Sequence, residues 1–388
     1  MNMNVKVNGY CDDFFKSVKD TFKKNFELGL EVGASFAVTL NGKLLVDLWA
    51  GYADSSYSKL WEKDTIVNVF STTKIITALC IHILIDRGLI ELDAPVAKYW
   101  PEFAQAGKEK LPVRYLLSHS SGLPGFEEKI SINDLYDWDR TTKLLAAQKP
   151  WWKPGSKCGY QSITFGYFLG ELVRRITGKS IGTFFRDEIA NPLNINFHIG
   201  LSKDYDIKVA EIIPPEDSIS NLQLKLMKLL FKTTFKVMFN PFIPYEVFNS
   251  REWRNAEIPA SNGHGNARSI AKVGAILACG GTLEDKQILS YSTIENAIKE
   301  QIYGRDRVIF RQKKRWGLGF GLLHDLYLLG PRSFYWSGLG GSYCIMDIEK
   351  KISIAYAMNK MRLFDEPRGE RLAKAVWDII NSDKFEIQ

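Results

Sequence analysis

The stretch that decides the fold is Val67-Asn68-Val69-Phe70-Ser71-Thr72-Thr73-Lys74, in which an apolar run leads to a serine and, three residues later, to a lysine. Residues three apart lie on one face of a helix, so the Lys74 amine is expected to face the Ser71 hydroxyl. A lysine whose pKa is lowered by burial can accept the serine proton and make the serine a nucleophile. Because an S-x-x-K match is common by chance, the ordinary alternative is a helix start with a solvated lysine.

The composition is that of a globular protein with a sizeable core. The chain has 388 residues and 45% of them are hydrophobic, which suits one large domain or two closely packed ones. No apolar run is long enough to span a bilayer, and the N-terminus lacks the apolar segment of a signal peptide. We therefore expect no transmembrane segment and a mature protein that begins at or near residue 1.

Cysteine usage and charge narrow the compartment and the partners. The five cysteines show no paired or metal-like spacing and their number is odd, which favours an intracellular, cytoplasmic location. The net charge of +7 is spread along the chain, apart from concentrations near residues 225–236 and at Arg311–Arg315. No nucleic-acid-binding module is recognisable, so nucleic acid is not expected as a partner. The five histidines lack ligand spacing, so no metal or other cofactor is expected.

Strand signals occur at both ends of the chain. A hairpin is predicted around Asn41-Gly42, after an amphipathic helix over Tyr10–Leu28. Later strands are predicted over Trp316–Leu323, Ser333–Trp336, Ser342–Asp347 and Ile352–Met358, before a final helix at Arg368–Asn381. The pattern predicts an α/β (α+β) fold, a single unit over 1–388 with a sheet region from 1–70 and 257–388 and a mainly helical region over 71–256.

The segment 219–240 stands apart within the helical region, in a stretch (213–256) that is a candidate lid. Apolar residues alternate there with four lysines that share one helical face, Lys225, Lys228, Lys232 and Lys236. Such a segment can form a lid, a wall of a substrate channel or a helix on a membrane surface. The alternative is an ordinary surface helix with solvated lysines.

Six ordered motifs resemble those of serine β-lactamase-like hydrolases, especially class C β-lactamases, family VIII carboxylesterases and their eukaryotic relatives. They run over roughly residues 30–375 and are Phe70-Ser71-Thr72-Thr73-Lys74, Leu116-Leu117-Ser118-His119-Ser120-Ser121-Gly122-Leu123-Pro124, Tyr160-Gln161-Ser162, Pro259-Ala260-Ser261-Asn262-Gly263, Trp316-Gly317-Leu318-Gly319 and Trp336-Ser337-Gly338. Several ordered motifs are far more specific than S-x-x-K alone. The resemblance implies a β-lactamase/transpeptidase-like fold, with an antiparallel sheet flanked by helices and an inserted all-helical region.

Carried over to this sequence, the resemblance implies that Ser71 attacks an acyl carbonyl and becomes acylated. Lys74 and Tyr160 would share the proton transfers, with either a lysine amine or a tyrosinate as the general base. The oxyanion hole would consist of the backbone N–H groups of Ser71 and Leu339. The residues then expected to contact the substrate are Ser162, Trp336, Ser337, Gly338 and His264.

Two positions depart from the family pattern and bear on the substrate. Ser162 stands where asparagine is usual, and Trp336 replaces the usual lysine or histidine. Without that cation a substrate carboxylate has no partner, which favours an uncharged hydrophobic ester over penicillin-like or D-amino-acid peptide substrates. Both departures also fit a catalytically inactive scaffold or binding protein, and acyl transfer to an alcohol is a further alternative.

Two histidines offer other interpretations. His119 is a tempting base for a Ser–His–Asp triad, but the chain has no G-x-S-x-G elbow, so a hydrogen-bonded structural histidine is the better interpretation. His264 can contact substrate or face solvent in a flexible loop before a helix at Ser269–Cys279. We therefore expect an esterase-like serine hydrolase acting on a small-molecule acyl substrate, and leave open membrane-surface contact through 219–240 and a homo-oligomer.

Overall fold

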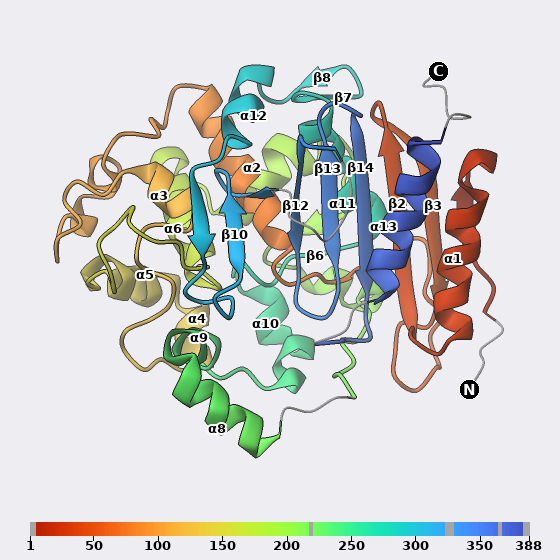
Figure 1. The fold of residues 1–388 in the computed structure, drawn as a ribbon, viewed down its shortest axis with the longest axis horizontal. Helices are drawn as coiled ribbons and strands as arrows, with labels where there is room; N and C mark the ends of the chain where they lie inside the picture. The colour runs from red at the N-terminus through yellow and green to blue at the C-terminus, as the bar shows by residue number, and fades with distance from the viewer. Residues whose placement is uncertain (1–4, 217–219, 323–329, 364–366, 383–388) are drawn as a thin grey trace.

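The computed structural model describes residues 5–216, 220–322, 330–363 and 367–382. Within these ranges the main sheet has nine antiparallel strands (Figure 1). In spatial order they are β1 (Asn8–Cys11), β3 (Lys43–Gly51), β2 (Gly33–Leu40), β14 (Ile352–Met358), β13 (Tyr343–Asp347), β12 (Ser333–Ser337), β11 (Gly321–Leu322), β10 (Lys313–Trp316) and β9 (Ile302–Arg305). N- and C-terminal segments therefore meet inside one sheet, where β2 pairs with β14, as predicted.

Helices cover both faces of this sheet. The α-helices of the described residues are α1 (Lys16–Glu27), α2 (Thr73–Asp86), α3 (Val113–Leu117), α4 (Ile132–Tyr136), α5 (Trp138–Ala147), α6 (Thr164–Thr177), α7 (Ile181–Phe185), α8 (Asn221–Leu230), α9 (Lys232–Met238), α10 (Arg251–Asn255), α11 (Ala267–Ala278), α12 (Tyr291–Ala297) and α13 (Pro367–Ile380). One apolar core lies between the sheet and α1 with α13, and a larger one lies on the α11 side and extends around α2 (Figure 1). The inserted helical region is thus joined to the sheet through a shared core.

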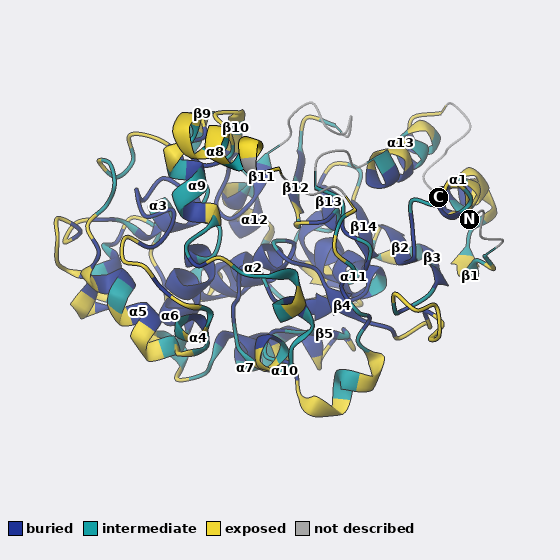
Figure 2. Cartoon of the chain, turned by 90° about the horizontal axis from the view of Figure 1, so that it is seen from below, coloured by how far each residue is buried: buried dark blue, intermediate teal, exposed yellow. Residues whose placement is uncertain are grey.

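α2 is the central helix of the larger core. Every residue from Thr73 to Leu84 is buried, because the helix is apolar on most sides (Figure 2). The strand just before α2, β4 (Val67–Asn68), forms a three-stranded sheet with β6 (His264–Gly265) and β5 (Phe197–His198). A further pair of strands consists of β7 (Thr282–Leu283) and β8 (Lys286–Gln287). No described helix is both long enough and apolar enough to cross a bilayer.

Four local predictions are wrong. The helix predicted over Tyr10–Leu28 begins only at Lys16, because Tyr10 and Cys11 pair with β3 in strand β1. Trp316–Leu323 is not one strand, because β10 ends at Trp316, the chain turns with Gly319 at φ 91°, and β11 begins at Gly321; Leu323 lies outside the described residues. The loop predicted before α11 contains β6, since its backbone pairs with β4 and β5 on both sides. Residues 219–240 form two helices, α8 and α9, separated at Phe231, and residue 219 lies outside the described ranges, as do 217–218 of the candidate lid.

Candidate active site

Ser71 lies where the short strand β4 turns into α2. Phe70, the preceding residue, has a positive φ of 46°, which costs a non-glycine residue about 1–3 kcal/mol. Its buried ring packs edge-on against Phe248 with a centroid separation of 4.9 Å. The Thr73 hydroxyl donates to the Phe70 carbonyl and accepts from the Gly263 N–H. Packing and hydrogen bonds on both sides therefore hold the turn that presents the serine.

Lys74 is completely buried in the first turn of α2, and four oxygen atoms surround its amine. The Nζ atom lies 3.1 Å from Ser71 Oγ and 2.9 Å from the Tyr160 hydroxyl. It also donates to the backbone carbonyls of Ser162 at 2.7 Å and Ala260 at 2.9 Å. The Tyr160 hydroxyl lies 2.7 Å from Ser71 Oγ. The structure thus brings together the three side chains for which the sequence predicts catalytic roles.

Burial sets the protonation states of this group. It holds the pKa of the Lys74 amine well below the ordinary lysine value, since the four oxygens around it include no carboxylate. Burial also raises the pKa of Tyr160; the hydrogen bond with Ser71 opposes this effect and the charge of Asp306 adds to it. Burial therefore favours the neutral amine of Lys74 and the neutral phenol of Tyr160 beside Ser71.

Asp306 fixes the loop that carries Tyr160. Its fully buried carboxylate accepts from the Tyr160 N–H at 3.1 Å and from the Trp316 indole at 3.2 Å. It also accepts from the backbone N–H groups of Val308 and Ile309. One side chain therefore closes its own turn and also holds Tyr160 and Trp316 in place. Sequence reasoning missed this residue, because a single aspartate in a basic stretch carries no motif.

His119 lies against Tyr160 but takes no part in the hydrogen bonds around Ser71. Its ring centroid is 5.3 Å from that of Tyr160 and 5.4 Å from that of Trp336. Its Nδ1 accepts from the Gln161 N–H at 3.2 Å. Burial, together with the nearby Lys74, holds the pKa of His119 well below its ordinary value. These contacts are those of a neutral structural histidine.

The segment after β12 passes directly over the turn that contains Ser71. A Cβ atom on Gly338 would lie 2.3 Å from the Val69 carbonyl oxygen, so only glycine allows this approach. The Ser342 hydroxyl donates to the same carbonyl at 2.8 Å and lies 3.0 Å from the Thr72 hydroxyl. Leu339 is half exposed, and its N–H donates to no group in the described ranges; the same is true of the Ser71 N–H.

The remaining predicted substrate residues differ in their surroundings. Trp336 is buried, whereas Ser337 is exposed. Ser162 offers Lys74 its backbone carbonyl, a role that the sequence did not suggest. His264 is fully buried in β6 with Nδ1 2.8 Å from the Asn262 carbonyl oxygen, so the alternative interpretation, a solvent-facing turn residue, is wrong. No recorded contact joins His264 to Ser71 within the described chain, and its contact with substrate stays a prediction.

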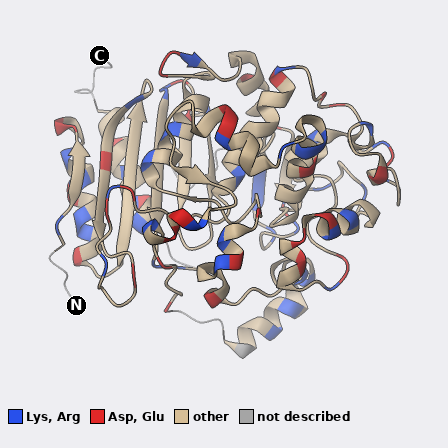
Figure 3. Cartoon of the chain, turned by 180° about the vertical axis from the view of Figure 1, so that it is seen from behind, with Lys and Arg blue, Asp and Glu red and all other residues tan. Residues whose placement is uncertain are grey.

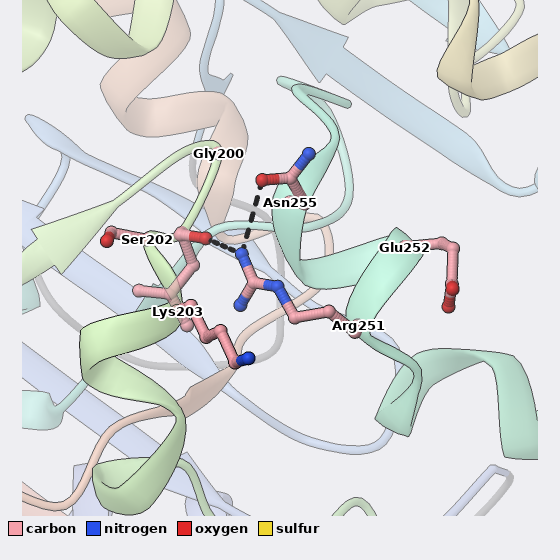
Figure 4. A pocket seen from close by; sticks show the side chains of 7 residues that line it. Gly200, Ser202, Lys203, Arg251, Glu252 and Asn255 are labelled. Carbon is pink, nitrogen blue, oxygen red and sulfur yellow. Dashed lines mark hydrogen bonds between the residues drawn. The ribbon is translucent and has the colours of Figure 1, made fainter.

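A separate cavity of about 680 Å³ lies away from these residues (Figure 4). It is lined by Gly200, Leu201, Ser202, Lys203, Arg251, Glu252 and Asn255. The Arg251 side chain crosses this cavity and donates hydrogen bonds to the Leu201 carbonyl, to Asn255 and to Asp206. The described residues contain no group of three or more side chains suited to hold a metal ion.

With this geometry established, comparisons with known proteins assign the chain to a family. The family model described as "Beta-lactamase" matches residues 22–376. The chain belongs to the beta-lactamase family. The predicted fold and the prediction of a serine hydrolase are confirmed.

Three proteins are similar to this chain over most of its length. "Esterase/beta-lactamase LipL" from Mycobacterium tuberculosis (strain ATCC 25618 / H37Rv) is 35% identical over 364 residues, covering 92% of this chain and 83% of LipL. A crystal structure of a family VIII carboxylesterase is 40% identical with a TM-score of 0.90, covering 96% of this chain and all of that one. A penicillin-binding protein homologue from Caulobacter crescentus is 36% identical with a TM-score of 0.87, over 96% of this chain and all of that one.

Proposed function

We propose that this beta-lactamase-family hydrolase is an esterase that cleaves uncharged hydrophobic esters through an acyl-enzyme on Ser71. The observation that carries the proposal is the closed triangle of Ser71, Lys74 and Tyr160, whose three oxygen and nitrogen atoms lie 2.7–3.1 Å apart. These distances are within the range for direct proton transfer. The same geometry argues against a catalytically inactive scaffold, which has no need to keep a buried amine beside a serine hydroxyl.

The hydrogen bonds of Lys74 favour the amine as the general base. A neutral amine has two N–H donors and one lone pair, and two backbone carbonyls, of Ser162 and Ala260, take up the donors. The lone pair is then left for the side facing Ser71 and Tyr160. The lowered pKa of Lys74 and the raised pKa of Tyr160 both disfavour the alternative, a lysinium paired with a tyrosinate.

The proton follows the triangle through each half of the reaction. As Ser71 Oγ bonds to the substrate carbonyl carbon, its proton passes to Lys74 Nζ, directly or by way of Tyr160. When the tetrahedral intermediate collapses, the C–O bond to the leaving alcohol breaks and the Tyr160 hydroxyl protonates that oxygen. Lys74 then returns a proton to Tyr160 across 2.9 Å. Water repeats the sequence and releases the acid.

The oxyanion would be held by the backbone N–H groups of Ser71 and Leu339. Both are without an acceptor in the described chain, and the close approach of Gly338 to Val69 brings their two segments together. Preorganised donors of this kind stabilise the charge that develops on the carbonyl oxygen. The N-terminus of α2 adds a favourable dipole.

The preference for an uncharged ester rests on residue 336. An indole takes the place of a cation, and its ring packs against Trp316 with a centroid separation of 5.3 Å, so no positive charge is offered there to a substrate carboxylate. Leu339 adds an exposed apolar side chain beside its own N–H. Similarity to proteins named esterase and family VIII carboxylesterase supports the same choice.

The experiment is labelling with a fluorophosphonate probe and turnover of p-nitrophenyl esters of increasing acyl length. Ser71→Ala should abolish labelling, and Tyr160→Phe should lower kcat about 100- to 10,000-fold with little change in KM. Matched controls are Ser202→Ala and the exposed Tyr303→Phe, which should behave as wild type. Wild type that neither labels nor turns over would refute the proposal. Faster turnover of a carboxylated ester or a penicillin than of the neutral ester would refute the substrate class.

We also propose that the protein works in the cytoplasm. All five cysteines are unpaired, which supports a reducing compartment. Fractionation of cells that express a tagged full-length chain tests this, and recovery in an oxidising, secreted fraction would contradict it.

A further inference from the structure

The outward face of α8 is apolar, which is unusual for a helix on the surface of a protein. Leu222, Leu226, Leu229 and Leu230 follow the spacing i, i+4, i+7 and i+8 of a single helical face, and we call these four residues the α8 face. Their exposed fractions are 66%, 46%, 66% and 63%. Figure 2 shows α8 largely in the colour of exposed residues, in contrast to α2 and α11.

The opposite side of α8 is apolar as well. Leu224 and Met227 are only partly exposed, and α9 is the element against which α8 chiefly packs among the described residues. A surface helix that packs only against the rest of its own chain needs one apolar side, and its solvent-facing side is usually polar. The second apolar side therefore indicates a partner that is not part of this chain's described core.

The charge around the α8 face indicates what that partner is. From residue 218 to residue 245 the sequence contains four lysines and no aspartate or glutamate. Lys236 pairs with Glu127 at 2.7 Å, but Lys225, Lys228 and Lys232 form no ion pair with a described residue. Lys225 and Lys228 lie along one flank of the leucines, and Figure 3 shows α8 at the lower margin of the molecule with basic but no acidic residues.

We propose that the α8 face docks on a lipid surface with anionic headgroups, with the leucines in the interfacial layer and the free lysines at the headgroups. An amphipathic helix that combines an exposed apolar face with flanking lysines binds in this way. The ten residues of α8 span about 15 Å, enough for two to three helical turns lying in the plane of the interface. Neither observation depends on the acyl-enzyme chemistry, so this inference stands apart from the proposed function.

The attachment of the helices connects this surface to the Ser71 site. Phe231, between α8 and α9, packs edge-on against Phe310 at 5.4 Å, in the same turn that Asp306 closes. Asn240, after α9, donates to the carbonyls of Phe126 and Glu128, in the loop that follows His119. The two segments that support Tyr160 thus also support α8 and α9, so a docked α8 holds these loops at the lipid surface.

The test is flotation of the full-length protein with vesicles of phosphatidylcholine alone or mixed with phosphatidylserine. Wild type should bind the mixed vesicles about tenfold more tightly or better, and the difference should shrink at high salt. Replacing the four leucines of the α8 face by serine should abolish binding to both vesicles. Lys225→Gln with Lys228→Gln and Lys232→Gln should remove the preference for phosphatidylserine.

Matched controls change exposed residues of the same kinds elsewhere. The control for the leucine changes is a double variant, Leu89→Ser with Ile207→Ser. The control for the lysine changes is a triple variant, Lys59→Gln with Lys63→Gln and Lys110→Gln. Thermal unfolding followed by circular dichroism checks that every variant is folded. Wild type that fails to float, or floats equally after the leucine changes, overturns the proposal. Loss of a dimer in light scattering after the leucine changes, without vesicle binding by wild type, assigns the face to a second copy and also overturns it.

Discussion

Replacement of Gly338 by alanine tests the proposed oxyanion hole most sharply. The new Cβ would lie 2.3 Å from the Val69 carbonyl oxygen and 2.4 Å from Ser342 Oγ. An ordinary contact begins at 3.4 Å, so one segment must move by about 1.1 Å (3.4 − 2.3). That movement separates the Leu339 N–H from the Ser71 N–H. A displacement of about 1 Å, or the loss of one oxyanion donor, lowers kcat about 100- to 1,000-fold.

The assay is steady-state hydrolysis of a neutral p-nitrophenyl ester, with thermal unfolding measured on the same samples. Gly338→Ala should reduce kcat/KM by that factor and slow fluorophosphonate labelling in parallel. Gly304→Ala is the matched control, because a Cβ at this position in β9 meets no atom within 4 Å. If Gly338→Ala is folded and retains kcat within threefold of wild type, Leu339 does not supply an oxyanion donor.

Three further predictions concern proton transfer, loop support and stability. Burial lowers the pKa of Lys74 and raises that of Tyr160, so kcat/KM should increase with pH as Lys74 loses its proton and should reach a plateau well below pH 10.5. A half-maximal point near pH 10.5 would show that the Lys74 amine is not the base. Asp306→Ala leaves the Tyr160 N–H and the Trp316 indole without their acceptor and should lower kcat about 10- to 100-fold. Asp306→Asn keeps an acceptor and should retain most of the wild-type kcat. Equal activity of the two variants would contradict the positioning role of Asp306. Arg368→Leu breaks a fully buried ion pair with Glu31 and should lower the free energy of unfolding, measured by urea titration, by about 3–5 kcal/mol. The control Arg371→Leu changes an exposed arginine and should alter this free energy by less than about 0.5 kcal/mol. Similar urea midpoints for both variants would contradict the prediction.

The sequence predicts the three side chains proposed to carry out the reaction, but it does not predict the groups that bind and position them. Helical spacing places Lys74 beside Ser71, and motif order places Tyr160 with them. The two carbonyls that bind Lys74 belong to Ser162 and Ala260, and any residue supplies a carbonyl. Asp306 was missed for a related reason, because the N–H groups that donate to its carboxylate come from segments that only the folded chain brings together.

The wrong local predictions share a physical cause. His264 looked like part of a flexible loop because glycines surround it, yet pairing with β4 and β5 buries it in a sheet of two-residue strands. Alternation suggested one strand over Trp316–Leu323, but the left-handed Gly319 allows a tight turn between β10 and β11. The periodic pattern across 219–240 continues through Phe231, while tertiary contact with Phe310 accompanies the break in the backbone there. Tertiary contacts overrode local patterns in each case.

The contacts of Lys74 have a consequence for the nascent chain. Its amine is enclosed by groups 86, 88 and 186 residues further along the sequence. In a solvated, incompletely folded chain the amine keeps its ordinary affinity for protons and is charged, so it cannot deprotonate the serine. On the proposed mechanism, reactivity toward acyl compounds therefore arises only after residues 160–162 and 260 have reached α2. An incomplete or misfolded copy carries an inert serine, which spares the cell an indiscriminate acyl acceptor.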